Sequence, residues 1–412
     1  MTRMKDSGIE WIGEVPEDWG IKPIKHIFGA IGSGTTPDSS KVEYYDGNIN
    51  WLQSGDLYKK DYVYVVSKTI TDLGYRSSAS LRIYQAPFLA IAMYGASIGN
   101  LAIIKIDACV NQAVAVLKGE ENIVRFAKLA LEISKTELIF AAQGGTQPNI
   151  NQVLIKNWVI PFPSEIEIKK IADFLDKKVA QLDKVKSLLE EQIKTLEDYR
   201  QSLIYETVTK GLDKTVPLKD SGVDWIGQIP EGWGIGRLKH FYNLFAGGDI
   251  QEENFSVEFD DKFCYPVLSN SKENNGIFGY SNVYRFEEGT VTVTGRGDIG
   301  YAEYRTFKYF PIIRLLVCVP FIKTDGRFTT YWINSAVIEK NQTAVSQLTR
   351  FTLGELPFPK IDLEVQREIA AFLDKKTEQI NQMIAIKKEQ IENINKQRQT
   401  LIYDYVTGKR RV

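Results

Sequence analysis

The sequence predicts an α+β protein formed by a pseudo-two-fold internal duplication. Two mostly-β globular domains are separated by two long helices, which pair as an antiparallel coiled coil. Three observations lead to this prediction: two ordered pairs of repeated segments, two unlike β-rich regions between them, and a seven-residue spacing of leucines. A length of 412 residues exceeds that of one ordinary domain, and 43% hydrophobic with 25% charged residues is typical of ordered globular protein. We divide the chain into globular residues 1–164 and 213–359 and helical residues 165–212 and 360–412.

The repeats define the frame of the molecule. Residues 5–28 and residues 219–242 share 14 of 24 positions at an offset of 214, and both contain a Trp-Ile-Gly string. Residues 171–209 and 369–407 share 18 of 39 positions at an offset of 198, and each follows a Pro-Phe-Pro string. The order of the segments is the same in both halves, so we infer a duplicated gene.

The regions inside this frame, residues 29–164 and 243–359, barely resemble each other. Both contain short β-type runs separated by Gly, Asn and Asp turn signals. The runs lie at residues 62–66, 88–92, 101–106, 291–294 and 312–319, and residues 122–142 have a helical pattern. A conserved frame around two different inserts suits a scaffold that carries two different recognition domains.

The two long helices are predicted from apolar heptads. The first contains Leu175, Leu182, Leu189, Leu196 and Leu203, and the second contains Leu373, Ile380, Lys387, Ile394 and Leu401. Such spacing over four heptads is typical of a coiled coil, and 39 helical residues extend about 58 Å. Alternatively, each helix packs on its own domain. We assign to the seam between the helices Leu182, Leu189, Leu196, Ile380, Ile391 and Ile394.

Composition excludes several classes of protein. Fifty-one basic and 52 acidic residues exclude a polybasic protein, and three separated cysteines argue against a disulfide scaffold or a zinc ribbon. The two histidines, His26 and His240, leave almost no material for a metal site or a His-based nucleophilic site. The start MTRMKDSG has no apolar run, and no stretch is long enough for a membrane span, so we expect a cytoplasmic protein.

The catalytic motifs that we sought are absent from the sequence. There is no Walker A string, no NPPY-type methyltransferase string and no PD…ExK nuclease cluster. Residues 295–300, GRGDIG, match the dinucleotide pattern GxGxxG. A strand-like run follows them instead of a helix, which favours a hairpin turn. The chain is therefore predicted to be a binding protein with no catalytic residues and no metal site.

In its arrangement the chain resembles the specificity (S) subunit of type I restriction–modification enzymes, over nearly its whole length. The motifs that carry the resemblance are WIGEVPEDW (11–19), WIGQIPEGW (225–233), GSGTTP (32–37), SGDL (54–57), YGASIG (94–99), NQA (111–113), GGTQPNI (144–150) and the two IAxFLDKK strings. The second variable region departs from the pattern, because no GxTP loop follows residues 245–248 and nothing closely matches Asn111-Gln112.

The resemblance implies a non-catalytic subunit that binds double-stranded DNA. Residues 1–164 and 213–359 would be target recognition domains, each reading one half of a bipartite asymmetric site. The helices would set the spacing and dock two modification (methyltransferase) subunits. Two restriction (translocase and nuclease) subunits would complete the assembly. S-adenosylmethionine, ATP and magnesium would bind to those partner subunits, with no cofactor in this chain.

Side chains that read bases are polar and lie on loops that can enter the major groove. In the first domain we select Lys41, Gln53, Ser54, Tyr94, Ser97, Gln143, Thr146 and Gln147. In the second we select Asn270, Lys272, Asn274, Asn275, Arg296, Arg327 and Thr329. The alternative for each Asn, Ser or Thr is that it satisfies its own turn.

Two other functions remain open. A coiled-coil adaptor would bind proteins rather than DNA through its β domains, and a nucleotide enzyme would be built around GRGDIG. Neither variable region has the basic excess that is usual for DNA binding: residues 29–164 carry 12 basic and 11 acidic side chains, and residues 243–359 carry 11 and 14.

Overall fold

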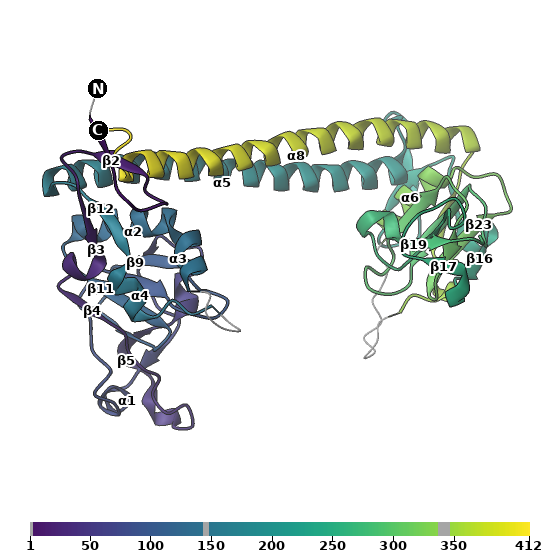
Figure 1. Cartoon of the computed structure of the whole chain (residues 1–412). Coiled ribbons are helices and arrows are strands. Elements are labelled where there is room, and N and C mark those ends of the chain that lie inside the picture. Colours follow the sequence, from purple (N-terminus) through teal and green to yellow (C-terminus); the bar gives the residue numbers. More distant parts are fainter. Residues whose placement is uncertain (1–2, 143–147, 337–346) are drawn as a thin grey trace. The chain divides into compact units, whose positions relative to one another are not determined.

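The structure is a computed structural model that describes residues 3–142, 148–336 and 347–412 (Figure 1). The chain forms two compact units. The first contains residues 1–189 and 389–412, and the second contains residues 190–388. These units cut across the four segments predicted from the sequence, because each long helix contributes one part to each unit.

The globular domain of the first unit is built on two larger sheets. A five-stranded sheet has the order β4 (Ala30–Gly32), β11 (Val114–Lys118), β8 (Phe88–Ala92), β9 (Leu101–Ile104) and β6 (Tyr62–Val63). A smaller sheet has the order β10 (Cys109–Val110), β5 (Tyr45–Leu52) and β7 (Thr69–Ile70), with β10 parallel to β5. The helices of this domain are α1 (Asp72–Arg76), α2 (Glu121–Ile133), α3 (Lys135–Ala141) and α4 (Gln152–Asn157). The predicted helix over 122–142 is thus divided at Ser134.

The second unit repeats the order of four of the five strands of the main sheet and has a four-stranded smaller sheet. Its main sheet is β16 (Tyr242–Ala246), β23 (Leu315–Pro320), β20 (Thr290–Thr294) and β21 (Ala302–Arg305). Its smaller sheet is β17 (Phe255–Ser256), β19 (Ile277–Ser281), β18 (Tyr265–Leu268) and β22 (Phe310–Pro311), with β22 parallel to β18. Helices α6 (Gly326–Ser335) and α7 (Arg350–Gly354) complete the domain. The two variable regions therefore share a topology that their sequences do not reveal.

Short sheets join the repeated segments to the exits of the domains. In the first unit β1 (Met4–Asp6) pairs with β2 (Glu14–Pro16), and β3 (Gly20–Pro23) pairs with β12 (Val159–Phe162). In the second unit β13 (Leu218–Asp220) pairs with β14 (Gln228–Pro230), and β15 (Gly234–Arg237) pairs with β24 (Pro357–Lys360). The 3-10 helices are η1 (Ile24–His26), η2 (Val42–Tyr44), η3 (Ser54–Leu57), η4 (Leu238–His240), η5 (Glu252–Asn254) and η6 (Glu273–Gly276). Each Pro-Phe-Pro string thus contributes to a strand that pairs with a repeated segment.

Helices α5 (Glu165–Lys210) and α8 (Leu363–Val406) run antiparallel within each unit. In the first unit the ring centroids of Phe174 and Tyr405 lie 4.6 Å apart, and Arg398 Nε lies 3.4 Å from Asp183 Oδ1.

In the second unit Lys387 Nζ donates to Gln192 Oε1 at 2.6 Å, and Arg200 donates to Asn381. As the residue number rises along α5, that of its partner on α8 falls, which confirms the predicted antiparallel pairing.

The helices end sooner than predicted because glycines terminate them. Gly211 follows α5 with φ 71°, and Gly408 follows α8 with φ 74°; left-handed glycine is a common helix stop. Of the predicted seam residues, Ile380 is buried, whereas the other five are half-buried: Leu182, Leu189, Leu196, Ile391 and Ile394.

The ends of the helices belong to the domain cores. Leu175 and Val406 lie in the core of the first unit, and Leu373 and Val208 lie in that of the second. Equivalent tyrosines connect the helix ends to the repeated segments. Tyr403 Oη donates to Ile12 O at 3.2 Å, and Tyr205 Oη donates to Ile226 O at 3.1 Å. The end of one helix and the start of the other thus complete each core.

The tryptophans of the repeated segments pack in these cores. Trp19 is 1% exposed, and its Nε1 donates to Glu167 Oε2 at 3.1 Å. Trp225 meets Trp332 with ring centroids 5.5 Å apart. Within the described part of the chain, no helix combines the length and the apolar character that a membrane crossing needs.

Candidate nucleic-acid interface

The GSGTTP loop of the first domain packs against the end of the parallel strand pair. A Cβ at Gly34 would lie 1.8 Å from Val110 O, so only glycine allows this approach. Thr36 Oγ1 lies 2.5 Å from Gln112 Oε1, and Trp51 Nε1 donates to Thr35 O at 3.3 Å. Motifs far apart in the sequence therefore meet at one edge of the small sheet.

Beside this edge is a hollow that brings together three of the predicted contact residues. Ser54 comes from η3, which follows β5, and Tyr94 and Ser97 come from the connection between β8 and β9. The hollow is lined by Ser54, Gly55, Tyr58, Tyr94, Gly95, Ala96, Ser97 and Ala113. No charged side chain is among these described lining residues.

The other predicted residues of the first domain are not part of the described lining of the hollow. Gln53 is half-buried, and its backbone N–H donates to Asp56 Oδ2 at 2.9 Å. Lys41 is exposed and donates to Tyr44 Oη at 3.1 Å, away from the lining of the hollow. Gln143, Thr146 and Gln147 lie outside the described residues. We keep the exposed and half-buried positions as candidates.

The structure adds three residues that the sequence analysis missed. Tyr58 is 59% exposed at the hollow, and the next two side chains, Lys59 and Lys60, are also exposed. Lys59 Nζ lies 5.2 Å from the centroid of the Tyr58 ring. Cations and aromatic rings side by side suit contact with phosphates and bases. The Tyr-Lys-Lys run directly after the SGDL string was the signal that could have identified them.

In the second domain, five predicted residues gather on two facing loops. Asn270 and Lys272 lie after β18, and Arg296 lies between β20 and β21. Lys272 Nζ is 3.2 Å from Asp298 Oδ1, and Gly295 N donates to Asn270 Oδ1 at 2.9 Å.

After Lys272, the first of these loops turns through left-handed backbone. The exposed Asn274 and Asn275 have φ values of 47° and 52°, a conformation in which Asn is enriched. Both loops occupy the topological positions of η3 and the β8–β9 connection of the first domain.

The roles of Asn270 and Arg296 differ within this surface. The Asn270 amide also donates to Ile313 O at 3.1 Å, so this side chain holds the two loops together. Arg296 is half-buried, and its Nε has no hydrogen-bond partner among the described residues. Arginine commonly pairs with guanine and with phosphate, so Arg296 stays a candidate here.

One prediction in the second domain, Thr329, needs correction, and a second predicted residue, Arg327, has a structural contact of its own. Thr329 is fully buried, and its Oγ1 lies 2.7 Å from Tyr242 Oη, so it belongs to the core instead of a DNA-contacting loop. Arg327 opens α6, where its Nη1 donates to Asp374 Oδ2 at 2.8 Å. This guanidinium fastens α6 to α8. The sequence showed only polar residues after a turn, which did not distinguish a loop from a helix start.

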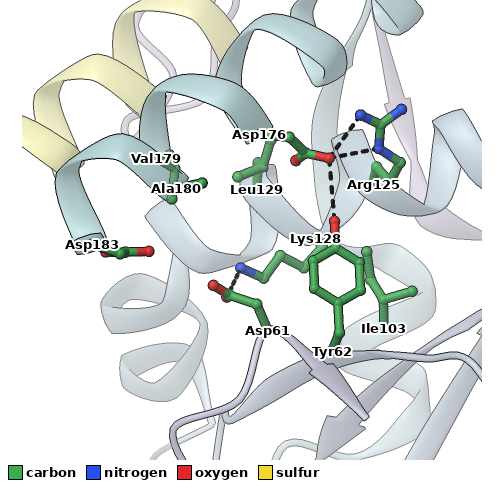
Figure 2. Close-up of a pocket in the computed structure, with 10 residues that line it drawn as sticks. All are labelled: Asp61, Tyr62, Ile103, Arg125, Lys128, Leu129, Asp176, Val179, Ala180 and Asp183. Carbon is green, nitrogen blue, oxygen red and sulfur yellow. Dashed lines mark hydrogen bonds and ion pairs between the residues drawn. The ribbon is translucent and has the colours of Figure 1, made fainter. Parts of the chain in front are cut away.

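A cavity of about 360 Å³ lies between the first domain and α5, as Figure 2 shows. Arg125 Nη2 lies 2.7 Å from Asp176 Oδ2, and Tyr62 Oη donates to the same oxygen at 3.2 Å. Burial and the nearby Asp176 charge raise the pKa of Tyr62 to about 12. The phenol therefore stays protonated at neutral pH and serves as a donor, so these contacts dock the domain to its helix.

The second unit has a matching contact. Asp374, which is the counterpart of Asp176 in the repeated IAxFLDKK string, accepts from Arg327 and from Tyr331 Oη at 2.9 Å. Tyr62 comes from a strand and Tyr331 from a helix, so the two tyrosines reach equivalent aspartates from different elements. We call these contacts the aspartate latches.

We predict that Asp176→Asn and Asp374→Asn each loosen only their own domain, by about 1 kcal/mol, because the carboxylates are partly exposed. Amide hydrogen exchange should accelerate in α2 for the first variant and in α6 for the second.

The pH dependence of the latches provides a second measurement. Burial raises the pKa of Tyr331 to about 12, as it does for Tyr62. Since a raised folded-state pKa favours folding below the ordinary value near 10, this contribution should fall as pH rises from 10 to 12. Exchange that is equally fast in both domains for either variant would contradict separate latches.

No group of three or more His, Cys, Asp or Glu that could hold a metal ion occurs among residues 3–142, 148–336 and 347–412. Burial raises the pKa of Cys109 to about 11, which makes a thiolate nucleophile unfavourable. The GRGDIG segment joins the antiparallel strands β20 and β21, which confirms the predicted hairpin.

The fold and these surfaces define a protein with two like-folded binding domains in a duplicated frame, each presenting different loop side chains at the same place. Comparison with known proteins identifies the family. The family model described as "Type I restriction modification DNA specificity domain" matches residues 16–197 and 230–394. The chain therefore belongs to the family of type I restriction–modification specificity subunits.

Individual relatives agree with this assignment. A putative type I restriction enzyme MjaX specificity subunit of Methanocaldococcus jannaschii is 24% identical over 97% of this chain and 96% of its own length. A putative type I specificity subunit of Mycoplasma pneumoniae, S.MpnORF507P, is 26% identical over 64% of this chain and 68% of its own.

Two solved structures share the fold. A chain from a study of complex assembly and conformational transition of the type I R-M system matches with a TM-score of 0.76 at 16% identity, over 95% of this chain and 98% of its own. The HsdS subunit from Thermoanaerobacter tengcongensis matches with a TM-score of 0.53 at 16% identity, over 96% and 98%.

Proposed function

We propose that this chain is the non-catalytic subunit that selects the DNA sequence for a type I restriction–modification complex. Each domain reads one half of a bipartite, asymmetric site in double-stranded DNA. The helices fix the distance between the half-sites and dock two methyltransferase subunits, and two translocase and nuclease subunits join them. S-adenosylmethionine, ATP and magnesium bind to those partner subunits. This assignment implies a cytoplasmic location.

One observation carries the proposal. The main sheets share an order of four strands, yet the loops at equivalent positions differ. The first domain has Ser54, Tyr94 and Ser97 where the second has Asn270, Lys272 and Arg296. A duplicated frame with unlike side chains at one topological position supports the reading of two different half-sites.

The near-neutral charge of the two variable regions affects which subunits can contact the DNA phosphates. Neither variable region has the excess of Lys and Arg that supplies most nonspecific affinity. We propose that the partner subunits supply much of the phosphate contact, while this chain supplies the base contacts.

The decisive experiment exchanges one insert. Residues 29–164 are replaced by the corresponding insert of a relative with a different target, and the donor must carry an arginine that can reach Asp176. The methylated motif of the assembled methyltransferase is then mapped by genome sequencing. We expect one half-site to change and the other to stay.

The outcomes separate the competing functions. If both halves change together, independent reading is wrong. If the parent complex methylates without any sequence preference, or assembles with proteins and binds no DNA, the adaptor function is correct instead. A control that replaces only the exposed Val153 on α4 by Ala should leave both half-sites as they are.

A further inference from the structure

We propose that the hollow of the first domain recognises the C5-methyl group of a thymine in its half-site. This inference rests on the proposed function and adds the chemistry of one base contact. It depends on the composition of the hollow, on the charge of its rim, and on the features that the major groove offers.

The described lining of the hollow is mostly apolar. Tyr58, Tyr94, Ala96 and Ala113 provide the carbon surface, and the serine hydroxyls of Ser54 and Ser97 are the only other side-chain polar groups besides the two phenols. The described lining contains no Arg, Lys, Asn, Gln, Asp or Glu. It therefore offers no bidentate partner for the edge of guanine or adenine, and no carboxylate for the cytosine amino group.

The major groove presents one apolar group, the methyl of thymine, beside the acceptor O4. A carbon surface with neighbouring hydroxyls complements that pair of features, since the methyl is removed from water and a hydroxyl can donate to O4. A cytosine in the same place carries its amino group at the position of O4 and has no methyl at C5, so the carbon surface would lose its contact.

The rim of the hollow indicates that its occupant carries phosphate. Lys59 and Lys60 directly follow Tyr58, and all three are exposed. Neither lysine forms an ion pair within the described part of the chain, in contrast to the second domain, where Lys272 pairs with Asp298. Two uncommitted cations beside an apolar hollow complement a nucleotide better than a neutral apolar ligand.

The test uses the assembled methyltransferase and duplexes that contain its mapped motif. Each thymine of the first half-site is replaced in turn by deoxyuridine, which keeps base pairing and removes only the methyl. We expect binding to weaken about fourfold at one position, which corresponds to one buried methyl-sized group. Cytosine at that position should bind still more weakly, and 5-methylcytosine should recover part of the loss.

A variant assigns the effect to the hollow. In Tyr58→Ala the loss on deoxyuridine substitution should shrink to below about twofold, because the wall that contacts the methyl is reduced. The Val153→Ala variant, on the exposed face of α4, should retain the full loss. Deoxyuridine in the second half-site should give the same result in the parent complex and in Tyr58→Ala.

The failures of the two proposals are distinguishable. If the complex methylates a defined motif, but deoxyuridine weakens binding at no position of the first half-site, the methyl contact is wrong and the proposed function stands. The same holds if Tyr58→Ala retains the full loss. If the complex shows no preferred motif, the proposed function itself fails.

Discussion

Insertion of one heptad into both long helices is expected to widen the spacer of the recognised DNA site and to leave both half-sites unchanged. Seven helical residues add about 10.5 Å, which is roughly three base-pair steps of 3.4 Å. The insertions belong after Gln192 in α5 and after Lys387 in α8, since these residues are hydrogen-bonded to each other. A seven-residue insertion preserves the apolar seam because it equals one repeat of that seam.

The control is an insertion of seven residues in α5 alone. It moves Arg200 away from Asn381 and shifts every later seam position, so the complex should lose activity instead of changing its spacer. Mapping the methylated motif distinguishes these cases. An unchanged spacer in the double insertion, with normal activity, would show that the helices do not set the distance between the half-sites.

The frame could be predicted from the sequence because its signals are local and repeated. Heptads and glycine stops can be recognised without knowledge of the tertiary structure. The predicted helices nevertheless run past the stops at Gly211 and Gly408. The shared topology of the inserts could not be predicted, because it depends on backbone contacts. Gly247 is an example: a Cβ there would lie 2.0 Å from Ile312 O, as one at Gly34 would lie 1.8 Å from Val110 O.

Those two glycines occupy equivalent places, yet their neighbours in the sequence differ, and only the pairing of strands reveals the equivalence. The candidate sites show the same limit. Ser54 and Ser97 line the hollow and stay predicted contacts, whereas Thr329 was assigned wrongly because its burial depends on Tyr242, which is 87 residues away. Polar side chains near turns are equally common in caps, in cores and at interfaces.

The first unit contains an ion network on which we base the second prediction. Lys128, with an 8% exposed side chain, is paired with Asp61 and with Glu132, whose Oε2 lies 2.8 Å from Nζ. Arg398 of α8 pairs with Glu132 and with Asp183 at 3.4 Å. Burial opposes the charged form of Lys128, but Glu132 and Asp61 outweigh it and raise its pKa.

We expect an asymmetry between removing the cation and removing its anions. Lys128→Met should change the free energy of unfolding by less than about 1 kcal/mol, because Asp61 and Glu132 are partly exposed and retain Arg398. The double variant Asp61→Asn with Glu132→Gln should lose about 3–5 kcal/mol, because Lys128 remains charged and buried without compensation. Adding Lys128→Met to the double variant should restore part of that loss.

The pH dependence of the same network gives an independent check. Burial raises the pKa of Asp61, but Lys128 and Arg398 outweigh it and hold that pKa below its ordinary value. Asp61 therefore stabilises the fold above the unfolded-state pKa near 3.9, and this contribution is lost as pH falls through the lower folded-state value. Chemical unfolding of the first unit, followed by hydrogen exchange in α2, should show less acid sensitivity in Asp61→Asn than in the parent. Lys128→Met could instead be the more destabilising change. In that case the aliphatic part of the lysine side chain matters more than its charge, and the network does not connect α2 and α8 through charge compensation.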